Sequence, residues 1–123
     1  MTREERDLLF KDLCARLSYG VKAQHNYKKE IFGDVEVIEA EGDIDLSYYD
    51  EETENWKLCC TSIDNIKPYL RPMSSMTEDE KNELSHYDNS VQRTDFFYSH
   101  HIDCRLMIEK GLALEAPKGM YKI

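Results

Sequence analysis

The chain lacks any long apolar segment. None of its 123 residues belongs to a run approaching the roughly 20 apolar residues that span a bilayer, and the first residues, MTREERDLLF, are charged where a signal peptide has an apolar core. These absences predict a cytoplasmic protein without membrane contact. In that compartment the four cysteines are expected to be thiols, and Cys59 and Cys60 are too close for an unstrained mutual disulfide.

Basic residues are missing from one long window. Residues 34–54 contain ten acidic residues and no Lys or Arg, in a chain with a net charge of −9. The acidic residues elsewhere nearly balance the 16 basic ones, so no basic stripe is available for phosphate contacts. The composition disfavours direct binding of nucleic acid and favours a protein partner, while the oligomeric state is left open.

The sequence also lacks a complete catalytic set. Ser74 and Ser75 have no flanking glycines of the kind that expose a serine nucleophile, and they precede a capped helix. No cysteine has an evident activating partner beyond its neighbours in sequence. Enzymatic activity therefore stays open, but a protein that is not an enzyme and has no cofactor is favoured.

The hydrophobic period changes from strand-like to helical near Pro72. Before it, residues 2–17 have helical spacing, and five strand-like segments follow at 20–27, 35–41, 43–46, 56–61 and 66–70. The doublet at residues 37–38 predicts a β-bulge. Beyond it, Thr77 and Glu80 form a capping box. Helical patterns then cover about 77–87, 90–100 and 103–110, with a tail at 112–123.

These patterns predict a single α+β domain over residues 1–123. Residues 1–72 would form an N-terminal helix and a small, bent antiparallel sheet, with the helices and tail of residues 73–123 packed on it. The order of one helix and five strands resembles that of SH3-like or Sm-like barrels, an analogy of fold alone. The expected core stripe of the helical part is Val91, Phe97, Tyr98, His101 and Ile102.

Three stretches carry a resemblance to a known family. They are LCARLSYGVK (13–22), IKPYLRPMSSMTEDEKNEL (66–84) and IEKGLALEAPKGMY (108–121). The chain resembles a family of small uncharacterised bacterial proteins found partly in prophage-like and other mobile elements. That family usually has Pro where this chain has Ser18. The resemblance implies no catalytic residue and no defined activity.

Alternating carboxylates form the first candidate surface. Glu39, Glu41, Asp43 and Asp45 would lie about 6.6 Å apart on one face of an extended ribbon. Such a ribbon could imitate nucleic acid and occupy a basic DNA- or RNA-binding protein. The alternative is a solvated sheet face whose charges protect the sheet edge from aggregation.

The same window matches the ligand spacing of an EF-hand. The residues at offsets 1, 3, 5, 7, 9 and 12 are Asp43, Asp45, Ser47, Tyr49, Glu51 and Glu54. However, Tyr48 occupies the position that requires glycine, and strand-like segments flank the loop where an EF-hand has helices. An acidic hairpin is therefore favoured over a calcium site.

A second cluster, His100, His101 and Cys104, could bind a soft metal. His100 and Cys104 are four residues apart and would share one face of a helix. Only this pair has usable spacing, and His101 falls on the predicted core stripe, so packing is favoured over metal binding. The leading hypothesis is a non-enzymatic binding or adaptor module, with the acidic mimic and a metal-dependent site as alternatives.

Overall fold

The chain folds into two compact units, which are described separately. In a computed structural model, in which residues 1–121 are described, the units comprise Met1–Tyr69 and Leu70–Ile123. They are called the sheet unit and the helical unit. Lys122 and Ile123, the end of the predicted tail, lie outside the described residues. No helix within residues 1–121 has the length and apolar character needed to cross a membrane.

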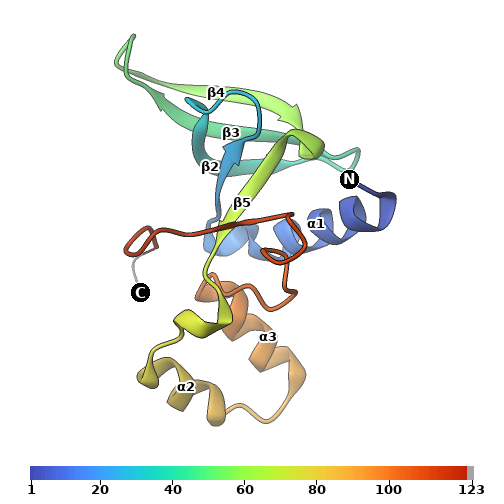
Figure 1. Ribbon diagram of the computed structural model, residues 1–123, viewed down its shortest axis with the longest axis vertical. Coiled ribbons are helices and arrows are strands. Elements are labelled where there is room, and N and C mark those ends of the chain that lie inside the picture. The colour runs from blue at the N-terminus through green and yellow to red at the C-terminus, as the bar shows by residue number, and fades with distance from the viewer. Residues whose placement is uncertain (122–123) are drawn as a thin grey trace. The chain divides into compact units, whose positions relative to one another are not determined.

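The sheet unit begins with helix α1, Arg3–Arg16. The hydroxyl of Thr2 accepts a hydrogen bond from the Glu5 amide at 3.1 Å, and the Glu5 carboxylate accepts one from the Thr2 amide at 2.9 Å. This reciprocal capping box satisfies two amides that the helix leaves free. Leu9 and Leu13 are buried, on a helix that runs beneath the strands (Figure 1). The predicted N-terminal helix is therefore confirmed.

Five strands follow α1 in the sheet unit. They pair in the order β4-β3-β2-β1-β5, and each neighbouring pair is antiparallel. Their bounds are β1 Lys22–His25, β2 Phe32–Ile38, β3 Asp43–Asp50, β4 Asn55–Ser62 and β5 Ile66–Leu70. Within the described residues β4 pairs only with β3, so the sheet is open along β4. The α+β class and the five predicted strands are confirmed, and β5 has the predicted bounds.

A β-bulge changes the face to which β2 directs its side chains. The register shifts between Val35, opposite Leu46, and Val37, opposite Asp45. As a result Val35 is buried in the core, whereas Val37 is 44% exposed on the other face. The predicted bulge is present, slightly earlier than the doublet at residues 37–38.

As far as residue 121, the helical unit contains two helices and a short strand. Its elements are the 3₁₀ turn Met73–Ser75, helix α2 Glu78–Ser85, helix α3 Ser90–Ser99 and strand β6 Leu114–Glu115. The Ala116 amide donates to the Leu70 carbonyl at 2.8 Å, so β6 lies beside the last residue of β5. Figure 1 shows α2 and α3 joined by a short connection. The buried apolar residues described here are Leu70, Leu84, Phe96, Tyr98, Ile102, Met107, Leu112 and Ala113.

Two predictions for this unit are wrong. Residues 103–110 form a series of turns rather than a third helix. The Asp103 carboxylate accepts hydrogen bonds from the amides of Met107 and Ile108 at 2.8 and 2.9 Å, and Leu106 has φ +58°, which interrupts a right-handed helix. In addition, Val91 is 69% exposed rather than part of the core.

Candidate functional site

One face of β3 and β4 is exposed and apolar at its hairpin end. Trp56 lies opposite Tyr49, and the two rings meet edge to face with centroids 5.6 Å apart. Leu58, two residues further along β4, points to the same face because side chains alternate along a strand. Trp56 and Leu58 are 68% and 67% exposed. A contiguous patch of this kind is typical of an interaction surface.

Phe32 extends this patch on β2. The register pairs Gly33 with Tyr48, so Phe32, which precedes Gly33, falls beside Tyr49. The Phe32 ring also meets that of Tyr69 edge to face, with centroids 5.4 Å apart. The patch is called the aromatic face, and its members are Phe32, Tyr49, Trp56 and Leu58.

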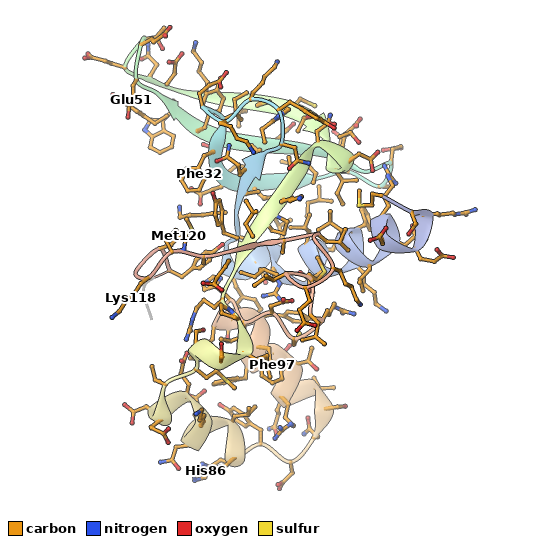
Figure 2. All side chains as sticks on the ribbon, viewed as in Figure 1. Phe32, Glu51, His86, Phe97, Lys118 and Met120 are labelled. Atoms are coloured by element: carbon orange, nitrogen blue, oxygen red, sulfur yellow. The ribbon has the colours of Figure 1, made fainter. Side chains whose placement is uncertain are left out.

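A groove of about 840 Å³ lies along the aromatic face. Figure 2 shows Glu51 at the tip of the β3–β4 hairpin, on the same side of the view as Phe32. Both aromatic rings and carboxylates line the groove, which suits a ligand with both apolar and cationic groups. The lining residues are Lys22, Glu30, Phe32, Gly33, Asp34, Tyr48, Tyr49, Asp50, Glu51, Glu52 and Trp56.

The groove has an excess of negative charge. Among the described residues that line it, the one ammonium group is that of Lys22, which lies 2.8 Å from the Asp34 carboxylate and is thereby neutralised. Within residues 1–121, no ion pair is found for Glu30, Glu51 or Glu52. The free carboxylates therefore favour a cationic ligand.

The hairpin tip is held by an ion pair between Asp50 and Lys57, 2.6 Å apart. Its hydrogen bond lowers the pKa of the Asp50 carboxyl and raises the pKa of the Lys57 ammonium. The amide of Glu52 also donates to Asp50 at 3.0 Å. Both partners are charged at neutral pH, so Lys57 offsets the charge of Asp50, and the charge of Glu52 also acts on its ammonium.

Three of the predicted acidic residues gather around Cys60, at the other end of the exposed face. Asp45 lies opposite Cys60, and its hydrogen bond raises the pKa of the thiol. The charges of Asp43 and Glu39 raise that pKa further. The thiol therefore stays protonated and is a poor nucleophile.

The predicted carboxylates do not form one continuous ribbon. Between β2 and β3 the Gly42 amide donates to the Glu39 carbonyl at 2.9 Å, and Gly42 has φ +95°. Glu39 and Glu41 thus lie on a hairpin turn, and the Arg6 guanidinium donates to the Glu41 carbonyl at 3.1 Å. Of the four carboxylates, only those of Asp43 and Asp45 lie on a strand and keep the expected alternation.

The EF-hand spacing does not produce a calcium loop. Asp43, Asp45, Ser47 and Tyr49 alternate along the extended strand β3. Alternate residues of a strand are about 6.6 Å apart, whereas calcium ligands converge to about 2.5 Å from one ion. The favoured interpretation, an acidic hairpin, is the one that the structure contains.

The second candidate pair, His100 and Cys104, does not share a helical face. His100 is the C-cap of α3, and His101 has φ +62°, so the helix ends before Cys104. His101 instead stacks on the Tyr121 ring, with centroids 3.9 Å apart. In the described part of the chain no group of three or more His, Cys, Asp and Glu residues could hold a metal ion.

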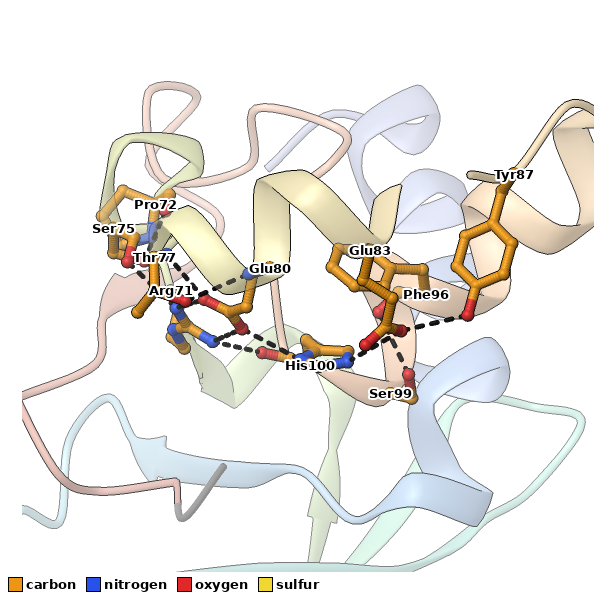
Figure 3. Close-up of polar contacts among 10 residues, drawn as sticks. All are labelled: Arg71, Pro72, Ser75, Thr77, Glu80, Glu83, Tyr87, Phe96, Ser99 and His100. Atoms are coloured by element: carbon orange, nitrogen blue, oxygen red, sulfur yellow. Dashed lines mark hydrogen bonds and ion pairs between the residues drawn. The ribbon is translucent and has the colours of Figure 1, made fainter. Parts of the chain in front are cut away.

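His100 belongs to a cluster centred on the buried carboxylate of Glu80 (Figure 3). The Arg71 guanidinium donates to both Glu80 oxygens at 2.7 Å, and the Thr77 amide donates to Oε1 at 2.9 Å. Nδ1 of His100 lies 2.9 Å from Oε2. Hydrogen bonds from Arg71, Thr77 and His100 lower the pKa of Glu80 from its ordinary 4.5 to about 2.

The outer part of the cluster is more exposed. Glu83 accepts a hydrogen bond from the Tyr87 hydroxyl at 3.0 Å, which raises the pKa of that phenol, and lies 3.8 Å from Nε2 of His100. The His100 ring stacks on Phe96 with centroids 4.2 Å apart. The five residues Arg71, Glu80, Glu83, Tyr87 and His100 are called the polar cluster.

The polar cluster connects elements of the helical unit. Arg71 also donates to the carbonyls of Ser75 and His100 at 3.0 and 3.2 Å, so one guanidinium joins three segments (Figure 3). The nearby hydroxyls of Ser75 and Ser99 donate to carbonyls of their own turns. The polar groups bind one another, an arrangement typical of a structural network rather than of an open reaction centre.

Comparisons with known proteins identify no relative. No protein-family model matches the chain, and no curated protein and no solved structure matches it.

The sequence indicates the acidic residues of the exposed face but not its aromatic ones. The signal was the alternation of Trp56, Leu58 and Cys60, which places three apolar residues on one side of a strand. Alternation alone does not say whether that side faces the core or solvent. The exposure of Trp56 and Leu58 in the structure shows that this side faces solvent.

Proposed function

We propose that this protein is a non-enzymatic binding or adaptor module, and that its protein partner docks on the aromatic face. The observation that carries this proposal is the combination of exposed Trp56 and Leu58 with the carboxylates of Glu30, Glu51 and Glu52, which line the adjoining groove. Partners of such a surface present apolar side chains next to Lys or Arg. Aromatic residues at the centre of an interface supply much of its binding free energy.

The distribution of charge supports a binding role over simple protection of the sheet. Protective charges belong on the edge strand itself. Here β4 carries one charged residue, Lys57, which is already paired with Asp50. The carboxylates of Asp43 and Asp45 lie on β3, and the exposed side chains of β4 include Trp56 and Leu58.

Two wider expectations remain part of this proposal. The first is membership of the family of small bacterial proteins associated with mobile elements, and the second is the likeness to SH3-like or Sm-like barrels. Both are compatible with an adaptor in the cytoplasm. Neither defines the partner, because one fold serves many functions.

Replacing Trp56 with Ser should abolish partner binding while leaving the fold intact. Trp56 is 68% exposed, so its loss removes contact area without leaving a cavity in the core. The measurement is affinity capture of the tagged protein from its native cytosol, with quantification of stoichiometric partners. We expect the Trp56→Ser variant to retain about one tenth or less of the captured partner.

The matched control is Val91→Ser, at an apolar residue of the helical unit that is 69% exposed. It should capture the partner as well as the unaltered protein does. Equal losses of captured partner in the two variants would show that capture depends on nonspecific binding to exposed apolar side chains. Turnover of a substrate that disappears on replacing one Cys or His would instead favour an enzyme.

An acidic mimic of nucleic acid is the second candidate function. The observation that favours it is the convergence of Glu39, Asp43 and Asp45 around Cys60, which concentrates negative charge at one end of the exposed face. The turn at Glu39–Gly42 counts against the mimic, because it breaks the regular spacing that carboxylates need to imitate a phosphate backbone.

Neutralising the four carboxylates distinguishes the mimic from the adaptor. In the mimic, a variant with Glu39→Gln, Glu41→Gln, Asp43→Asn and Asp45→Asn loses salt-sensitive binding to a basic nucleic-acid-binding partner, by about tenfold or more. The measurement is capture at increasing salt, followed by competition with duplex DNA or RNA. Capture that is unchanged by the four substitutions would exclude the mimic and leave the aromatic face as the binding surface.

A further inference from the structure

We infer that the free edge of β4 binds an extended basic segment of the partner as an added strand. The inference rests on the proposed function and specifies how the partner docks and what it carries. Three features support the inference: the backbone of β4, the side chains beside this strand, and the charge around the strand.

The backbone of β4 offers a long edge for pairing. The strand has eight residues, Asn55–Ser62, and pairs with β3 along its whole length. Alternate residues of an edge strand direct their N–H and C=O groups away from the sheet. Within the described residues no other strand pairs with β4, and the strand contains no proline or glycine to block an added strand.

The side chains beside this edge favour an alternating partner sequence. Trp56 and Leu58 point to one face, near the hairpin tip, and Cys60 follows them next to Asp45. An added strand would lay every second side chain against this row. Apolar side chains fit beside Trp56 and Leu58, and Lys or Arg side chains reach the carboxylates at both ends.

Charge identifies the occupant as basic rather than as a second copy of this chain. Two copies paired through β4 about a two-fold axis would run antiparallel. The acidic tip of one copy, around Glu51 and Glu52, would then lie beside Asp43 and Asp45 of the other. Because residues 34–54 hold ten acidic residues and no basic one, this pairing is repulsive. A basic segment removes the repulsion and pairs the same charges.

The test uses a peptide of about nine alternating Lys and Val residues, long enough to pair with the eight residues of β4. Trp56 is the only tryptophan of the chain, so its fluorescence reports on binding at this surface. Amide hydrogen exchange measured by NMR shows whether a strand has been added. We expect slower exchange at alternate amides of β4, those that face the free edge.

Two controls separate this mode from charge attraction. A peptide with Ser in place of each Val keeps the charge, and we expect it to bind about tenfold more weakly or worse, because the apolar contacts are lost. The Leu58→Ser variant should also bind the Lys/Val peptide more weakly than the unaltered protein does. Equal binding of the two peptides would overturn the inference.

The remaining outcomes distinguish the inference from the proposed function. If the peptide changes Trp56 fluorescence but leaves exchange of the β4 amides unaltered, the ligand covers the face without adding a strand, and the inference is wrong. If the peptide does not bind while Trp56-dependent capture of a protein persists, the inference is also wrong and the adaptor proposal stands. If the peptide does not bind and Trp56-dependent capture of a protein also fails, both the added-strand inference and the adaptor proposal are wrong.

Discussion

Replacing Glu80 with Gln should destabilise the helical unit by about 3 to 5 kcal/mol, the cost of removing one partner of a buried ion pair. The side chains of Arg71 and Glu80 are only 10% and 5% exposed. Gln retains an oxygen for the Thr77 amide, but it leaves the guanidinium of Arg71 buried without a counter-ion. Urea unfolding followed by far-UV circular dichroism measures the loss, with Trp56 fluorescence reporting separately on the sheet unit.

The effect of Glu80→Gln should depend on pH. Because the folded protein lowers the pKa of Glu80 from 4.5 to about 2, this carboxylate stabilises the fold above about pH 4.5. That contribution, about 3 kcal/mol, falls away as the pH decreases toward 2. The difference in unfolding free energy between the unaltered protein and the variant should therefore shrink over this range and be nearly constant above it.

The matched control is Glu83→Gln, which alters a neighbouring carboxylate of the polar cluster. Glu83 is 48% exposed and lies 3.8 Å from His100. An exposed pair of this kind contributes about 1 kcal/mol or less. Similar losses in the two variants, or a difference for Glu80→Gln that persists at pH 2, would contradict the central role of Glu80.

The polar cluster also shows which features could be predicted from the sequence. The capping box of Thr77 and Glu80 depends on residues three apart, and it was predicted and found. The contacts that the Glu80 carboxylate makes with Arg71, which donates to it, and with His100 join residues 9 and 20 positions apart. Such contacts depend on the tertiary fold, so no local sequence pattern predicts them.

The errors in the helical unit have local causes. Residues 103–110 have a helical apolar period, but the Asp103 carboxylate bonds to two later amides and Leu106 adopts a positive φ. Side chains of Asp compete for backbone hydrogen bonds in this way. Val91 fits a helical stripe, yet its place in the first turn of α3 leaves it in solvent.

The sequence predicts only the acidic part of the candidate site. Composition alone shows an acidic window, and so the carboxylates of Asp43 and Asp45 were found from the sequence. The aromatic face requires the register of three strands, which brings Phe32, Tyr49 and Trp56 together from segments 17 and 7 residues apart. Register depends on packing of the opposite face and on the bulge in β2.

Gly33→Ala should destabilise the sheet unit by about 3 kcal/mol, at the upper end of the usual cost of overpacking. In the sequence Gly33 belongs to a polar connection, where alanine would be neutral or slightly stabilising because it restricts the unfolded chain. In the structure Gly33 lies in β2, where a Cβ atom would overlap the backbone carbonyl oxygen of Ser47. Both backbones are held in the sheet ladder, so neither can move aside cheaply.

Trp56 fluorescence during urea unfolding measures this loss, since the only tryptophan belongs to the same sheet. Ser47→Ala is the matched control, because it alters the neighbouring side chain and retains the carbonyl; it should change stability by about 0.5 kcal/mol or less. A Gly33→Ala variant as stable as the unaltered protein would contradict the register of β2 and β3. Because the aromatic face depends on that register, such a result would also remove the geometric basis of the proposed binding surface.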